Sequence, residues 1–176
     1  MKIHNLLFLP IMFAYSQSIL LEPFKSMESW EPLNFKKIDK HTQYSIDKRN
    51  PHGSYLKAES DNSASGLIWE KSFDVNESPL LRWKWKVSNI YSKGNAKEKS
   101  GDDYPIRIYV MFEYDPETVG FLESALYESA KLLYGEYPPH SSLNYIWSNK
   151  NHAEEIIPNS YTEKAQMILM QKGKTN

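Results

Sequence analysis

The chain has 176 residues, of which 40% are hydrophobic, and this is enough for one globular domain with its own core. Its 21 basic and 22 acidic residues give a formal net charge of -1, which argues against a nucleic-acid partner because phosphate binding needs a concentrated basic field. Cysteine is absent, which excludes disulfides, thiolate metal sites and a cysteine nucleophile. Aromatic residues make up 14% of the chain and favour strands, so we expect mostly β structure.

The first 18 residues have the pattern of a secretory signal peptide. Lys2 precedes an apolar run from Leu6 to Ala14, and cleavage is expected after Ser16 or Ser18. The run is too short to span a bilayer comfortably, and no cysteine follows it that could carry a lipid anchor. We therefore expect residues 19–176 to form a single domain that is periplasmic or secreted. The alternative is an amphipathic first segment of a cytosolic domain.

Short strands separated by turn-forming residues are predicted in the first half of the mature chain. We expect them at residues 33–38, 43–46, 54–60 and 66–75. Pro51 and Gly53 mark the turn between the second and third strands. Strands of this length and spacing are typical of an antiparallel sandwich or barrel.

The segment LRWKWKV alternates apolar and basic residues and predicts another strand. One face would carry Leu81, Trp83, Trp85 and Val87, and the other Arg82, Lys84 and Lys86. Each Trp side chain buries about 150 to 250 Å² when it is enclosed, so we expect the indoles to face the core and the cations to face solvent. The alternative is that the two indoles form a platform for stacking on a sugar.

A long polar loop, residues 88–103, precedes the strand PIRIYVMFEY, and loops of this length are either functional or disordered. The residues expected to point inward are Ile106, Ile108, Val110 and Phe112, and those expected to point outward are Arg107, Tyr109, Met111 and Glu113. Both sets contain apolar residues. This composition predicts a central strand that is covered on both faces.

One α-helix is predicted, starting at Asp115 and stopping at Gly135. Its apolar stripe would consist of Leu122, Ala125, Leu126, Ser129, Ala130 and Leu133, and we expect the helix to lie across a sheet edge or face. After it we expect a strand at 141–149, a loop, and a last strand at 164–173.

Taken in order, several segments resemble one protein family. They are Ser63-Ala64-Ser65, LRWKWKV, GDDYPIRIYVMFEY, LNYIWSN and NSYTEKAQMILMQKG. The family is a group of exported bacterial proteins known only as a domain of unknown function, and the resemblance covers roughly residues 35–173. It implies an antiparallel β-sandwich of jelly-roll type, here with one inserted α-helix, and no established reaction. It also implies one or two strands beyond Asn176, so either the product is truncated or an exposed edge strand is left that invites a partner strand.

Charged residues on the outer faces of the predicted strands LRWKWKV and PIRIYVMFEY suggest a polar ligand site. Adjacent strand residues point to opposite faces, so one of Asp102 and Asp103 is expected to face the loop and the other to join Arg107. The predicted ligand-binding residues are Arg82, Lys84, Asp103, Arg107 and Trp147. Two alternatives stay open: a cross-strand ion-pair ladder without a ligand, and burial of Trp147 with Tyr145 in the core.

Other chemistries find less support. The histidines, which are His4, His41, His52, His140 and His152, show no metal-ligand spacing, and no cofactor is expected. Asp103 and Glu113 lie about 33 Å apart on one extended strand and cannot flank one glycosidic bond. We expect a non-catalytic module that binds a polar polymer or glycan of the cell envelope. The alternatives are a cell-envelope glycan hydrolase on the same scaffold and a structural domain whose edge recruits a partner strand.

Overall fold

The computed structural model describes residues 20–49, 51, 53–134 and 137–174. The predicted signal peptide, residues 1–18, and the helix stop expected at Gly135 lie outside the described residues. The chain divides into two compact units, one up to Trp83 and one from Lys84 onward, and each is described by itself. Within the described ranges, no helix is long and apolar enough to cross a membrane.

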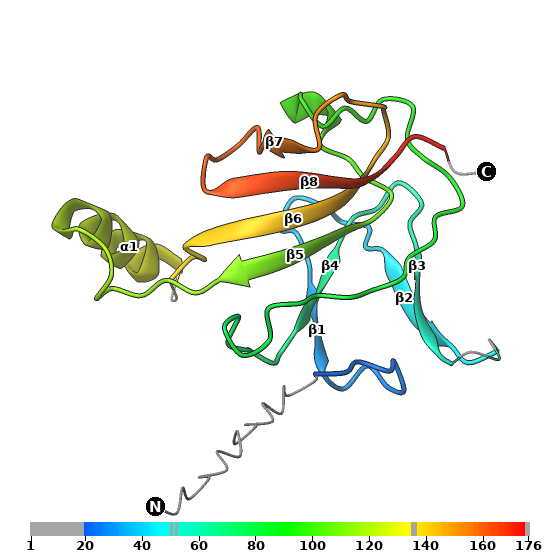
Figure 1. The fold of residues 1–176 in the computed structure, drawn as a ribbon, viewed down its shortest axis with the longest axis horizontal. Coiled ribbons are helices and arrows are strands. Elements are labelled where there is room, and N and C mark those ends of the chain that lie inside the picture. Colours follow the sequence, from blue (N-terminus) through cyan, green and yellow to red (C-terminus); the bar gives the residue numbers. More distant parts are fainter. Residues whose placement is uncertain (1–19, 50, 52, 135–136, 175–176) are drawn as a thin grey trace, which may run out of the picture. The chain divides into compact units, whose positions relative to one another are not determined.

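The first unit contains two antiparallel strand pairs (Figure 1). They are β1 (Trp30–Leu33) with β4 (Gly66–Trp69), and β2 (Gln43–Asp47) with β3 (Tyr55–Glu59). Trp30 lies opposite Trp69, and their rings stack with centroids 6.3 Å apart. This pair of indoles explains why the first strand starts at Trp30 and not at Leu33 as predicted. The fourth strand ends at Trp69, so Phe73 is not part of it and is exposed.

The second unit is built on a four-stranded mixed sheet with the order β5-β6-β8-β7 (Figure 1). Its strands are β5 (Arg107–Phe112), β6 (Ser141–Ser148), β7 (Ile156–Pro158) and β8 (Ala165–Lys172). β5 pairs antiparallel with β6, β6 pairs parallel with β8, and β8 pairs antiparallel with β7. The prediction of mostly β structure with one α-helix is confirmed, although one strand pair is parallel. β7 was not predicted because it has only three residues inside a polar segment.

The core of the second unit lies on one face of this sheet. The buried cluster consists of Ala96, Ile146, Ile157, Met167 and Leu169, with Tyr104 packed against it. Strand alternation puts Arg107 and Tyr109 on this same face, because they pair with Ile146 and Asn144 on β6. Arg107 was predicted to point away from the core, and this is wrong: its side chain lies on the core face of the sheet, at the border of that face.

The polar segment of residues 88–103 packs tightly over this face. It includes a short 3-10 turn, η1 (Lys99–Gly101). A Cβ added to Gly94 would lie 1.9 Å from Nδ2 of Asn149, so the backbone approaches that side chain too closely for any other residue. Oδ1 of Asn149 in turn accepts a hydrogen bond of 2.7 Å from the backbone N–H of Tyr91. The segment is therefore a closely packed cover with fixed contacts.

The ribbon LRWKWKV is not a strand, since residues 80–87 belong to no ladder. The alternation of its side chains is nevertheless as predicted: Trp83 and Trp85 are half-buried, whereas Arg82, Lys84 and Lys86 are exposed. Leu81 departs from the pattern and is 45% exposed. Alternation alone does not supply the neighbouring strand that a ladder requires.

β5 lies at an edge of the sheet, so the prediction of a central strand is wrong. Its exposed side chains explain the error: Tyr109 and Met111 are 40% and 48% exposed. Apolar residues on both faces of a strand are typical of a covered strand, but here one set borders solvent.

The helix α1 (Phe121–Tyr134) starts six residues later than predicted. Asp115 caps a turn, because its Oδ1 accepts a 2.9 Å hydrogen bond from the N–H of Glu117. The helix is held on its inner side by Tyr127, whose ring stacks on that of Tyr114 with centroids 3.8 Å apart. The predicted apolar stripe points outward instead: Leu122 and Leu126 are 80% and 72% exposed.

Candidate functional site

The most concentrated polar cluster of the second unit lies at the start of β5. Arg107 begins this strand, and its Nη1 lies 3.4 Å from Oδ1 of Asp102. The guanidinium carbon lies 5.5 Å from the ring centroid of Tyr104 and 5.1 Å from that of Tyr109. The Arg107 and Asp102 side chains are 28% and 21% exposed, so solvent still reaches both. We call these four residues the Arg107 site.

The ion pair at this site is loose. Nη1 lies 3.4 and 3.5 Å from the two oxygens of Asp102, whereas a strong charge-assisted hydrogen bond measures about 2.7 to 2.9 Å. An arginine carries five N–H donors in a planar fork, and both of these contacts use the same nitrogen. No other described residue accepts a hydrogen bond from the Arg107 side chain, so its remaining donors are available to an acceptor that approaches from solvent.

Tyr104 closes the inner side of the site. Its hydroxyl is buried and makes no hydrogen bond of ordinary geometry to any described residue. Burial, followed by the nearby negative charge of Asp102, raises the pKa of Tyr104 well above that of a free phenol. Burial also raises the pKa of Tyr109. Both phenols are therefore neutral at physiological pH, and their rings offer uncharged faces to the guanidinium.

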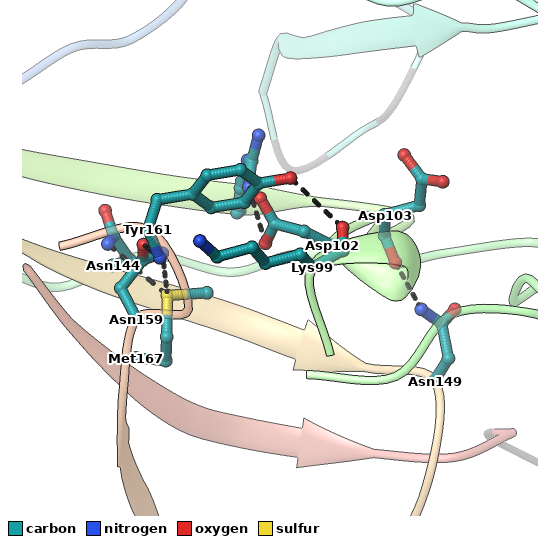
Figure 2. A network of polar contacts seen from close by, with 9 residues as sticks. Lys99, Asp102, Asp103, Asn144, Asn149, Asn159, Tyr161 and Met167 are labelled. Carbon is teal, nitrogen blue, oxygen red and sulfur yellow. Dashed lines mark hydrogen bonds and ion pairs between the residues drawn. The ribbon is translucent and has the colours of Figure 1, made fainter. Parts of the chain in front are cut away.

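A buried amide lies beside Tyr109. Asn144, opposite it on β6, is 1% exposed, and its Nδ2 lies 3.4 Å from the sulfur of Met167. Nδ2 of Asn159 lies 3.2 Å from the same sulfur (Figure 2). Thioether sulfur is a weak acceptor, and Oδ1 of Asn144 has no partner among the described residues. The amide of Asn144 is therefore poorly satisfied for so deep a position.

A tyrosine from the segment before β8 contacts η1, the turn that directly precedes Asp102, and we call it the rim. The hydroxyl of Tyr161 donates a 3.0 Å hydrogen bond to the carbonyl oxygen of Lys99, and the lysine Nζ lies 5.3 Å from the tyrosine ring centroid (Figure 2). The N–H of Tyr161 donates to Oδ1 of Asn159 at 2.9 Å, which ties the rim to the buried amides. Because Tyr161 is 62% exposed, most of its ring borders solvent.

The structure places the predicted ligand-binding residues in different surroundings. Arg107 lies at the site, and the carboxylate beside it is that of Asp102, while the side chain of Asp103 points away from Asp102 (Figure 2). Lys84 is exposed in the same unit, and Arg82 is exposed in the first unit. Trp147 is only 4% exposed.

The contacts of Trp147 show that its ring is a packing element. Its indole N–H donates a 2.9 Å hydrogen bond to the carbonyl of Gly173, and its ring centroid lies 5.9 Å from that of Trp85. Trp147 thus completes the packing and presents no open ring face. Of the two alternatives for this residue, burial is the one observed.

Sequence reasoning missed Tyr104 as a neighbour of Arg107 and Tyr161 as a neighbour of Lys99. Tyr104 stands in the G-D-D-Y segment, directly after the two carboxylates, and this proximity was the available signal. Tyr161 lies about 60 residues away in a polar loop, where neither periodicity nor a motif marks it. Among the described residues, no group of three His, Asp or Glu side chains is placed to hold a metal ion.

Comparison with protein families gives a match that covers residues 28–176 and has the description "Protein of unknown function (DUF3047)". The chain belongs to the DUF3047 family. Comparison with curated proteins and with solved structures found no match. The match confirms the family resemblance that was predicted from the sequence of this DUF3047 protein.

Proposed function

We propose that this DUF3047 protein is an exported, non-catalytic module that binds a polar polymer, namely a glycan of the cell envelope, at the Arg107 site. The scaffold proposed for it is the jelly-roll sandwich that the family resemblance implies. The export signal expected in residues 1–18 supports the location of the ligand.

One observation carries this proposal: the Arg107 guanidinium lies near two neutral tyrosine rings and is only loosely engaged by Asp102. Glycan sites combine aromatic faces with a few polar groups that fix hydroxyls. Here the N–H fork of Arg107 and the carboxylate oxygens of Asp102 provide donors and acceptors side by side. The partly exposed rings of Tyr109 and Tyr161 provide the aromatic faces.

The arrangement favours binding over hydrolysis. A glycosidase needs two carboxyl groups that face each other across the bond to be cleaved, about 5 to 9.5 Å apart. At the Arg107 site, Asp102 is paired with a cation, and Asp103 points away from Asp102 (Figure 2). The carboxylates near Arg107 therefore act as hydrogen-bond acceptors in this proposal.

The test is binding of the purified protein to an array of envelope polysaccharides, followed by calorimetry on the polysaccharides that bind. We expect Arg107→Ala to weaken binding by about 10-fold or more, because a hydrogen bond to a charged group contributes about 1.5 to 3 kcal/mol. Arg107→Lys should recover little of this, since lysine keeps the charge but loses the planar fork. Lys150→Ala removes a more exposed cation from the same unit and serves as the control for loss of positive charge.

Further variants measure how far the site extends. Arg82→Ala, Lys84→Ala and Asp103→Ala test the other charged residues that the sequence predicted for ligand binding. Absence of binding to every polysaccharide would contradict the proposed function, and unchanged binding by Arg107→Ala would contradict the proposed site. Release of new reducing ends from a bound polysaccharide would instead support the hydrolase alternative.

A further inference from the structure

The two edges of the four-stranded sheet differ in how they are protected. The β7 edge has three residues and ends at Pro158, and both features discourage pairing with another strand. The β5 edge has six residues, RIYVMF, without proline, glycine or lysine. Among the described strands, β6 is the only one hydrogen-bonded to β5. A long, apolar strand of this kind is an open template for a further strand.

The hydrogen bonds to β6 show which backbone groups face the open edge. The N–H of Trp147 donates to the carbonyl of Ile106 at 3.2 Å, and the N–H of His140 donates to the carbonyl of Phe112 at 2.9 Å. Even-numbered residues of this strand therefore direct their backbone groups toward β6. The backbone N–H and C=O groups of Arg107, Tyr109 and Met111 consequently point toward the open edge.

The side chains along this edge are complementary to their own copy. Arg107 stands at one end, and the exposed carboxylate of Glu113 directly follows the other end. If two β5 strands run antiparallel with Val110 facing Val110, each Arg107 lies opposite Glu113 of the second copy. Tyr109 then lies opposite Met111, a pairing of ring and sulfur that is favourable. A register centred on Tyr109 would oppose Arg107 with Met111 and would lose both ion pairs.

We propose that β5 is a self-association edge, through which a second copy of this chain pairs antiparallel about Val110 to form one continuous eight-stranded sheet. The twofold axis repeats every contact, so two Arg107–Glu113 ion pairs and two Tyr109–Met111 contacts form together. The long distance between Arg107 and Asp102 leaves the guanidinium free to reach a second carboxylate. This inference does not depend on the proposed glycan ligand.

Sedimentation velocity over a range of protein concentrations tests the pairing. The wild-type chain should sediment as a dimer that dissociates on dilution. Met111→Lys should raise the dissociation constant at least about 10-fold, because lysine on an edge strand opposes pairing. Met170→Lys is the matched control: Met170 is 47% exposed against 48% for Met111, but it lies on the inner strand β8, so the dimer should persist.

Cross-linking tests the register. The chain has no cysteine, so a disulfide in the variant Val110→Cys joins two copies. Directly opposed residues of a non-hydrogen-bonded antiparallel pair have Cα atoms about 4.5 Å apart, within the range that a disulfide spans. We expect rapid cross-linking at Val110 and slower cross-linking for Ile108→Cys.

Three outcomes would overturn the inference: a wild-type chain that is monomeric at all concentrations, a dimer that survives Met111→Lys, or cross-linking that is not fastest at Val110. The exposed stripe of α1 is a competing candidate for the dimer interface, and the variant Leu126→Glu tests it. Loss of the dimer in this variant alone would assign self-association to the helix. Glycan binding is also measured on the Met111→Lys monomer, so that self-association and the proposed function can fail independently.

Discussion

At the scale of single residues, the cover of residues 88–103 depends on the close approach of the backbone at Gly94 to its neighbours. An added Cβ at Gly94 would lie 1.9 Å from Nδ2 of Asn149 and 2.8 Å from the carbonyl oxygen of Asp103. Gly120 offers the contrast, since nothing lies within 4 Å of its added Cβ.

We predict that Gly94→Ala lowers the free energy of unfolding by about 2 kcal/mol, because overpacking a tightly filled position typically costs about 1 to 3 kcal/mol. Gly120→Ala should change it by less than about 1 kcal/mol, toward stabilisation, since alanine restricts the unfolded chain. Urea unfolding of both variants checks this. Equal effects of the two substitutions would show that the contact at Gly94 is relieved by movement of Asn149.

Asp47 contributes to the pH dependence of the first unit. Its carboxylate is 7% exposed, and it accepts hydrogen bonds from the N–H of Arg49 at 2.9 Å and from its Nε at 3.0 Å. These bonds hold the pKa of Asp47 well below its usual range. A carboxyl whose pKa is lower in the folded than in the unfolded state stabilises the fold above its unfolded pKa. This contribution disappears as the pH falls below about 4 and toward the folded pKa.

We therefore predict that the melting temperature of the wild-type chain falls more steeply between pH 5 and pH 2 than that of Asp47→Asn. The asparagine variant should be less stable at pH 7 and should approach the wild type at the acidic end. Glu59→Gln, an exposed carboxylate on the neighbouring strand, is the control and should leave the slope unchanged. Parallel curves for all three proteins would contradict the assignment.

At the scale of elements, the sequence predicted that α1 has an apolar stripe, but this stripe faces solvent and not the sheet. The apolar stripe exists, but its residues Leu122 and Leu126 are 80% and 72% exposed. The side that faces the rest of the unit is held by Tyr127, whose ring stacks on Tyr114 and whose hydroxyl lies 3.2 Å from Nζ of Lys164. The anchor is aromatic and polar, so a count of aliphatic residues on each face points to the opposite side.

Two adjacent positions of α1 should respond very differently to truncation. Tyr127→Ala should lower the free energy of unfolding by about 3 kcal/mol, because a buried aromatic ring and its stacking partner are lost. Leu126→Ala should change it by about 0.5 kcal/mol or less, since that side chain is already exposed. Chemical denaturation measures both. A larger loss at Leu126 would mean that the stripe, and not the tyrosine, anchors the helix.

The positions of most strands could be predicted from the sequence, whereas the pairing between strands could not. β2, β3, β6 and β8 lie within one or two residues of the predicted segments, because alternation is a local property. Pairing is decided by residues far apart in the chain, and so the edge position of β5 and the missing ladder of LRWKWKV were not predictable. The same holds for the site: Arg107 stood out in the sequence, whereas Tyr161 approaches Lys99 from 62 residues away.

At the scale of the whole molecule, the order of strands in the second unit constrains how the chain acquires its structure. β8, the last described strand, lies between β6 and β7 and is hydrogen-bonded to both. During synthesis, β6 and β7 therefore emerge from the ribosome before the strand that joins them exists. The sheet closes only after about Lys172 has been made, so the nascent chain lacks the β6–β8 pairing until that point. If the chain is exported as we propose, this delay keeps the sheet open during passage through a translocation pore, which premature closure would block.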